Sequence, residues 1–154
     1  MVKDLLQFEE LQTEKDAFGF AEGVFGFRRY LANTINPYTT MVETFYSDAS
    51  LCYPIVVQNY QAFSSYQLDY CAETADLLSQ ADLIERKMFS EGNWAGSRAC
   101  AVFCGLLPGM AGAEKQIAHK NFLYPAFPSI VSIWNQAKSN VALMQDMLLE
   151  QMLS

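Results

Sequence analysis

Apolar side chains recur at intervals of three and four residues over much of the chain, which is the spacing of one face of an α-helix. The longest series covers residues 53–89 and consists of Val56, Tyr60, Phe63, Tyr70, Leu77, Ala81, Ile84 and Met88. Pro54 suits the first turn of a helix, and the glycine of the Glu91–Asn93 segment suits its end. We therefore predict a long central helix over about residues 53–90.

The length of this helix bears on the shape of the molecule. A continuous helix of this length measures about 54 Å, whereas a compact chain of 154 residues has a radius of gyration of about 15 Å. Polar Gln67 and Thr74 occupy two places in the apolar series. Either the helix breaks, near Ser64 and Ser65, or the molecule is elongated and part of its apolar stripe needs a partner.

A second strong series reaches the end of the sequence and consists of Ile130, Trp134, Ala137, Val141, Met144, Leu148 and Met152. Pro128 suits its first turn, and Ser139, Asn140 and Asp146 lie on the opposite face. This pattern predicts an amphipathic C-terminal helix over about residues 128–152. We expect it to lie antiparallel, or nearly so, against the long central helix.

Three weaker helices complete the pattern. One covers Lys3–Phe18, a shorter one carries Val24, Phe27, Leu31 and Ile35, and a third extends from Trp94 to Leu107 and ends at Pro108 and Gly109. The sequence therefore predicts an all-α fold, a single-domain bundle of four or five helices over residues 1–154.

The composition is apolar for a small domain. Hydrophobic residues make up 51 % and aromatic residues 14 % of the chain, while charged residues make up 18 %, below the usual share of about 25 %. We therefore expect protein partners or self-association to cover part of the apolar surface.

The charge pattern excludes several classes of partner. The net charge is −7 and the ten Lys and Arg residues are scattered, which excludes nucleic-acid binding through phosphate neutralisation. No uninterrupted apolar run approaches the length of about 20 residues that a membrane span needs. The acidic, periodic N-terminal segment indicates no cleavable targeting signal, and we expect an intracellular or virion location.

Two cysteines lie four residues apart in the segment CAVFCGLLPGMAG, which begins at residue 100. On a helix, Cys100 and Cys104 share a face and could supply half of a metal site. Cys52 and Cys71 are too isolated in the sequence to form a second motif. We expect the Cys100 and Cys104 pair to be buried structural packing, with a thiol-based role as the alternative.

No catalytic or cofactor motif appears in the sequence. His119, the one histidine, has no orienting partner that the sequence identifies. Gln116 stands where a ferritin-like Glu-x-x-His motif needs glutamate, and the glycines of the GFAEGVFGF segment lack the lysine of a phosphate-binding loop. We therefore predict a protein without enzymatic activity, cofactor or resident metal.

Aromatic residues are dense around the middle of the chain. The candidate residues for packing or for a protein interface are Tyr60, Phe63, Tyr66, Tyr70, Trp94 and Trp134. Tyrosine and tryptophan are enriched both in cores and at interface hot spots, and helical bundles also hold flat apolar ligands between aromatic side chains.

Two functional hypotheses follow. In the first, the chain is a non-enzymatic helical subunit of a multi-protein complex or virus particle and acts through protein–protein contacts. In the second, it is a small helical carrier or sensor that binds an apolar or aromatic ligand between its helices.

Overall fold

The computed structural model describes residues 16–64, 67–117 and 125–154, and the chain is all-α over these ranges. Residues 16–25 are helical, and the elements that follow are α2 (Phe27–Asn33), α3 (Pro37–Ser47), α4 (Ala49–Phe63), α5 (Leu68–Glu91), a 3-10 turn (Trp94–Gly96), α6 (Ser97–Ala101), a π turn (Val102–Leu106), α7 (Leu107–Glu114) and α8 (Ser129–Leu153). The predicted fold class is confirmed, but the helices outnumber the four or five expected. Most of the helix predicted over Lys3–Phe18 lies outside the described residues.

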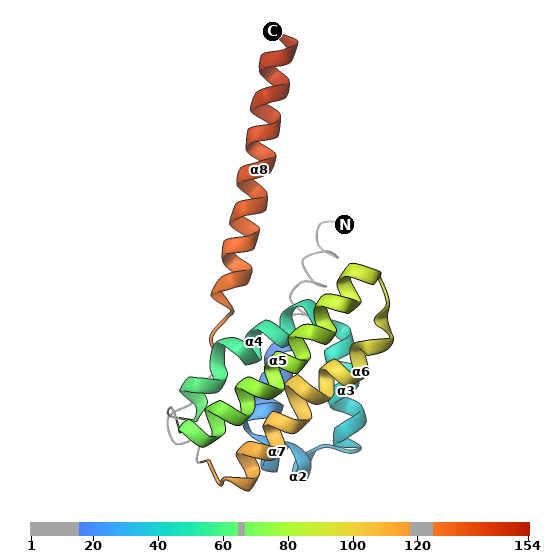
Figure 1. Ribbon diagram of the computed structural model, residues 1–154, viewed down its shortest axis with the longest axis vertical. Coiled ribbons are helices and arrows are strands. Elements are labelled where there is room, and N and C mark those ends of the chain that lie inside the picture. The colour runs from blue at the N-terminus through green and yellow to red at the C-terminus, as the bar shows by residue number, and fades with distance from the viewer. Residues whose placement is uncertain (1–15, 65–66, 118–124) are drawn as a thin grey trace.

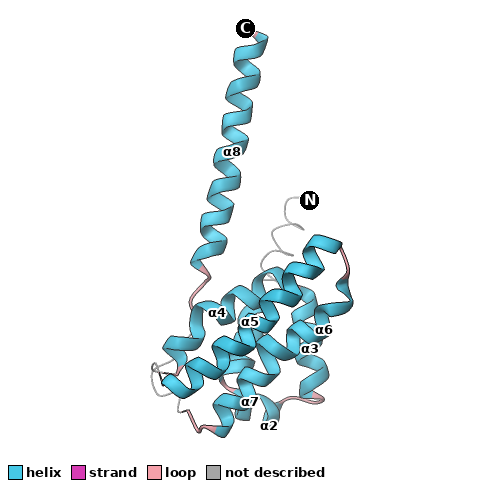
Figure 2. Ribbon diagram, viewed as in Figure 1, coloured by secondary structure: helices cyan, strands magenta, loops and turns pink. Residues whose placement is uncertain are grey.

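The helices other than α8 form a packed body. Helix α5 lies against α4, α6 and α7, while α3 packs on α6 and α2 packs on α7. Helix α8 leaves this body beside α4 and extends away from it as a single rod (Figures 1 and 2). The molecule is elongated because of α8 and not because of the central helix.

The long central helix predicted over residues 53–90 is wrong, because the chain divides there into α4 and α5. Helix α4 ends at Phe63, where the Ser64 N–H donates to the Tyr60 carbonyl, and α5 begins at Leu68. The two helices still turn their apolar sides to one core, since the rings of Phe63 and Tyr70 meet edge to face at 5.7 Å. The break near Ser64 is therefore the alternative that the structure adopts.

Local signals explain where the helices begin and end. The Asp48 side chain accepts a hydrogen bond from the Leu51 N–H at 3.2 Å and starts α4 four residues before the predicted start, so Pro54 lies inside the helix. Gly92 ends α5 as predicted, in the left-handed conformation with φ of 64°. Helix α3 was not predicted, because Pro37 resembled a loop residue although proline also suits the first turn of a helix.

The helix that was expected to end at Pro108 and Gly109 continues through the segment CAVFCGLLPGMAG. The π turn ends at Leu106, Pro108 is the second residue of α7, and α7 continues to Glu114. A π turn shifts the backbone hydrogen bonds by one residue, so the proline that follows needs no N–H at that point. The small residues serve close packing: a Cβ added at Gly105 would lie 2.6 Å from the Phe20 ring.

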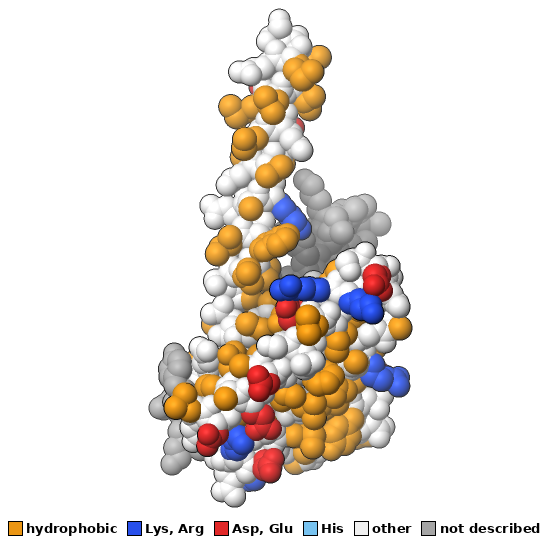
Figure 3. All heavy atoms as spheres, viewed as in Figure 1, with side chains coloured by type: hydrophobic (Ala, Val, Ile, Leu, Met, Phe, Trp, Pro, Cys, Tyr) orange, Lys and Arg blue, Asp and Glu red, His pale blue; other side chains and the backbone are white. Residues whose placement is uncertain are grey.

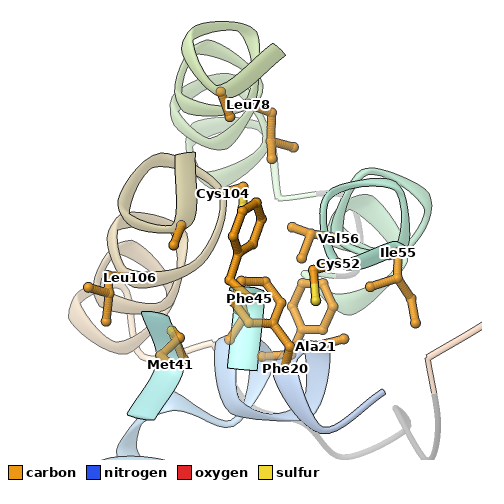
Figure 4. Close-up of a cluster of buried hydrophobic side chains, with 14 of the residues drawn as sticks. Phe20, Ala21, Met41, Phe45, Cys52, Ile55, Val56, Leu78, Cys104 and Leu106 are labelled. Atoms are coloured by element: carbon orange, nitrogen blue, oxygen red, sulfur yellow. The ribbon is translucent and has the colours of Figure 1, made fainter. Parts of the chain in front are cut away.

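The core gathers side chains from all helices of the body. Phe45 of α3 lies near its centre, and its ring centroid is 5.8 Å from that of Phe20 (Figure 4). The buried residues around them include Ala21, Met41, Cys52, Ile55, Val56, Leu78, Cys104 and Leu106. No residue of α8 belongs to this fully buried set.

Candidate interaction helix

Helix α8 is apolar yet exposed. No residue of Ser129–Leu153 is fully buried, and Val131 alone is partly buried, where it packs against the core. The other large apolar side chains are more than half exposed, namely Ile130, Ile133, Trp134, Val141, Leu143, Met144, Met147, Leu148, Leu149, Met152 and Leu153. Figure 3 shows these side chains along the length of the rod. Exposed apolar surfaces of this extent are typical of interaction sites.

Part of this surface forms a continuous stripe, which we call the α8 seam. It consists of Ile130, Trp134, Ala137, Val141, Met144, Leu148 and Met152. With about 100° of rotation per residue, these positions fall within about 80° of one another. The predicted amphipathic helix over residues 128–152 is therefore confirmed, but its expected position against the central helix is wrong.

The opposite side of α8 carries its two acidic side chains, together with Leu143 and Leu153. Ser139, Asp146 and Glu150 lie roughly 160–180° from the centre of the α8 seam. Lys138 flanks the seam and is the one cation among residues 129–153. The helix therefore has few charges and a net charge of −1 from these three ionised side chains.

The base of α8 is fixed to α4 by Asn59, whose side chain is buried. Its Nδ2 donates to the carbonyls of Ile55 at 2.7 Å and Ala126 at 2.9 Å, and its Oδ1 accepts from the Ala126 N–H at 2.7 Å. Two of these bonds join Asn59 to Ala126, one to its carbonyl and one to its N–H. The chain entering α8 is therefore fixed in position relative to α4.

Further contacts set the direction of the helix. The Gln58 Oε1 accepts from the Ser129 hydroxyl at 3.2 Å and lies 3.4 Å from the Ser129 N–H, one of the unpaired donors at the start of α8. Pro125 and Pro128 are both buried and restrict the backbone on either side of Ala126. Specific contacts at the base of α8 therefore set the direction in which the helix projects. In the sequence, two amides in an apolar stretch, Gln58 and Asn59, are the main sign of it.

The aromatic candidates lie in different parts of the molecule. Phe63 and Tyr70 are core residues, and Tyr60 is half-buried at the α4 surface. Trp94 is exposed and packs edge to face on Phe89 at 5.1 Å. These residues do not form one surface with Trp134, which belongs to the α8 seam, and Tyr66 lies outside the described residues.

Three of the four cysteines lie in the core. Cys52, Cys100 and Cys104 are fully buried, whereas Cys71 is partly exposed, and the Cys100 thiol donates weakly to the Ala81 carbonyl at 3.7 Å. Burial raises the pKa of the Cys52 and Cys104 thiols, with a further contribution from Asp48 at Cys52 and from the Cys100 thiol at Cys104, so the protonated thiol is favoured at both. Within the described ranges, no three His, Cys, Asp or Glu side chains cluster as a metal would need. His119 lies outside those ranges.

The surface of the body is hollowed at several places, and two hollows lie beside residues discussed above. The larger, of about 1020 Å³, lies between helical residues 19–34, Phe63 and residues 112–117. Its lining includes Glu22, and the guanidinium of Arg28 at its edge donates to the Ala113 carbonyl at 2.8 Å. The smaller, of about 430 Å³, lies between Tyr53 and Tyr60 of α4 and the facing side of α5.

Glu85 lies on α5, near Asp82 and the Tyr53 phenol. Burial, with a smaller contribution from Asp82, raises the pKa of Glu85 from 4.5 to about 7. Folding therefore favours the protonated carboxyl. The stability of the folded chain is highest below pH 4.5 in this respect and falls as the pH rises through about 7.

Replacement of Glu85 by glutamine should remove this loss of stability at high pH. We expect the variant to gain about 1–2 kcal/mol at pH 8 and little at pH 4.5, less than the full pKa shift would give because the carboxyl is partly exposed. Urea unfolding at both pH values measures the gain, with Glu43→Gln on the exposed side of α3 as control. An equal pH dependence in the variant and the parent chain would contradict this assignment.

No helix in the described part of the chain has both the length and the hydropathy to cross a bilayer. Comparison with protein-family models, curated proteins and solved structures gives no match. The geometry of α8 and its base is therefore the best indication of function.

Proposed function

We propose that the chain is a non-enzymatic helical subunit of a protein assembly and that the α8 seam is its contact surface. The observation that carries the proposal is the exposure of the seam along a helix that Asn59 and Gln58 hold away from the body. Burying apolar side chains is the main favourable term in protein association. A multi-protein complex or a virus particle provides such a setting.

The chemistry of α8 favours a protein partner over a lipid surface. Helices that lie on membranes carry Lys and Arg on their polar face, which attract anionic headgroups. The side of α8 opposite the seam carries Asp146 and Glu150 and no cation. A protein surface with its own apolar stripe therefore fits α8 better.

Replacement of Leu148 by aspartate tests the proposal. A charge in the centre of the seam should remove the chain from its assembly without changing its fold, because Leu148 lies outside the core. Native mass spectrometry of chain recovered from its source measures the loss, and circular dichroism checks the fold. Ser139→Asp, on the opposite side of α8, should leave the assembly intact. A parent chain that is recovered as a bare monomer would contradict the proposal.

A ligand carrier is the second candidate, and the hollow of about 1020 Å³ favours it. Of the described aromatic candidates, Phe63 alone lines that hollow, and charged side chains share the lining. The same mass spectrum separates the two functions, because a carrier would appear as a monomer with a small bound mass.

A further inference from the structure

We infer that the partner of the α8 seam is the α8 seam of a second copy of this chain, with the two helices antiparallel. This inference rests on the proposed function and adds to it the identity and the direction of the partner. Four observations carry it: the area of the seam with its flanks, the order of large and small side chains along the seam, the directions of the helix dipoles and charged bodies, and the distribution of apolar side chains beyond the seam.

The seam together with its flanking residues, which make up about half of the circumference of α8, has an area that suits a dimer of two equal helices. A helix of 25 residues is about 37 Å long and about 10 Å wide, so half of its circumference offers roughly 600–800 Å². A standard protein interface buries about 800 Å² per partner. The three- and four-residue spacing extends over the whole rod, which is the pattern by which one helix packs on another of similar length.

The side chains of the seam complement each other in the antiparallel direction. With Val141 of one copy opposite Met144 of the other, small Ala137 lies opposite Leu148 and bulky Trp134 lies opposite Gln151 near the helix end. Alternation of large and small side chains across a contact fills space evenly. A parallel pair in register would instead place each seam residue opposite its own copy, so that Trp134 meets Trp134 and Ala137 meets Ala137.

Charge favours the same direction. The first half of α8 carries Lys138, and the second half carries Asp146 and Glu150. Asp146 and Glu150 lie on the side of α8 that faces away from the seam, so they form no ion pair with Lys138 across it, but the antiparallel direction opposes the two helix dipoles, which is the favourable arrangement. Residues 1–128 carry six of the seven net negative charges, and the antiparallel direction keeps these bodies at opposite ends.

The distribution of apolar side chains gives a fourth indication. Beyond the seam, the second half of α8 carries Leu143, Met147, Leu149 and Leu153, so that it is apolar over most of its circumference. A helix that is apolar on nearly all sides is usually buried on more than one side. In the antiparallel pair this half lies beside the first half of the partner helix and close to the body of the partner, which can cover it.

A complementation experiment with the full chain tests both the partner and the direction. Ala137→Lys and Leu148→Glu each place a charge in the seam, and each should weaken the homodimer by about 100-fold or more. An equimolar mixture pairs Lys at position 137 with Glu at position 148 and leaves Ala137 opposite Leu148 at the second contact. Mixing should therefore restore the dimer. Ser139→Lys is the control on the opposite side and should remain dimeric.

Analytical ultracentrifugation at micromolar concentration measures the outcome, with circular dichroism as a check on the fold. A parent dimer, two monomeric variants and a dimeric mixture support the inference. A parent chain that is monomeric or larger than a dimer overturns it, as does a single variant that remains dimeric or a mixture that remains monomeric. A monomeric parent chain leaves the proposed function standing if chain from its source still assembles with other proteins through Leu148.

Discussion

Replacement of Phe45 by alanine should lower the free energy of unfolding by about 3–5 kcal/mol, the usual cost of truncating a buried phenylalanine. The Phe45 ring is fully buried at the centre of the core and packs on Phe20. Removing it leaves a cavity that helices on all sides would have to close. Chemical denaturation followed by circular dichroism measures the change.

The neighbouring residue provides the control. Tyr46 lies on the same helix but is 52 % exposed, so Tyr46→Ala should change the free energy of unfolding by less than about 1 kcal/mol. Similar losses from both substitutions would contradict the position of α3 in the body. The comparison is informative because α3 is the helix that the sequence did not predict.

Replacement of Asn59 by alanine should lower the free energy of unfolding by about 2–3 kcal/mol and release the base of α8. The substitution removes the three hydrogen bonds of the buried Asn59 side chain, and each such bond contributes about 0.5–1.5 kcal/mol. Hydrogen exchange of the Ala126 amide should become faster, and a protease should cleave more readily near Pro128.

Gln58→Ala is the control for this second effect. Gln58 is exposed and its contacts to Ser129 are longer, so its loss should cost less than about 1 kcal/mol. We call the hydrogen bonds between Asn59 and Ala126 the clamp. Unchanged exchange of the Ala126 amide in the Asn59 variant would show that the clamp does not hold α8. Because both residues belong to α4, the pair of variants separates the clamp from the general stability of that helix.

The elements that local patterns determine were predictable from the sequence. The repeat from Ile130 to Met152 identified α8, and Gly92 marked the end of α5, because each depends only on neighbouring residues. The break between α4 and α5 was obscured for the same reason. The three- and four-residue spacing of apolar residues continues across residues 64–68. The pattern therefore does not reveal a turn there, because the number of residues in the turn preserves the spacing.

Other features depend on contacts between distant residues. Nothing local indicates that Asn59 meets Ala126, 67 residues later in the sequence. The path through Pro108 depends on a π turn stabilised by the packing of the residues around it, whereas the proline by itself indicated a helix end. The exposure of the α8 seam is likewise a property of the whole fold, since the same pattern would suit a helix packed on the body.

The clamp at Asn59 also affects the thermodynamics of assembly. A helix joined to its domain by a loose linker loses orientational entropy when it binds, and that loss reduces affinity. Pro125, Pro128 and the Asn59 hydrogen bonds restrict the direction of α8 during folding, before any partner arrives. The association constant of an assembly made through α8 should therefore fall when the clamp is removed, even though the contact surface itself is unchanged.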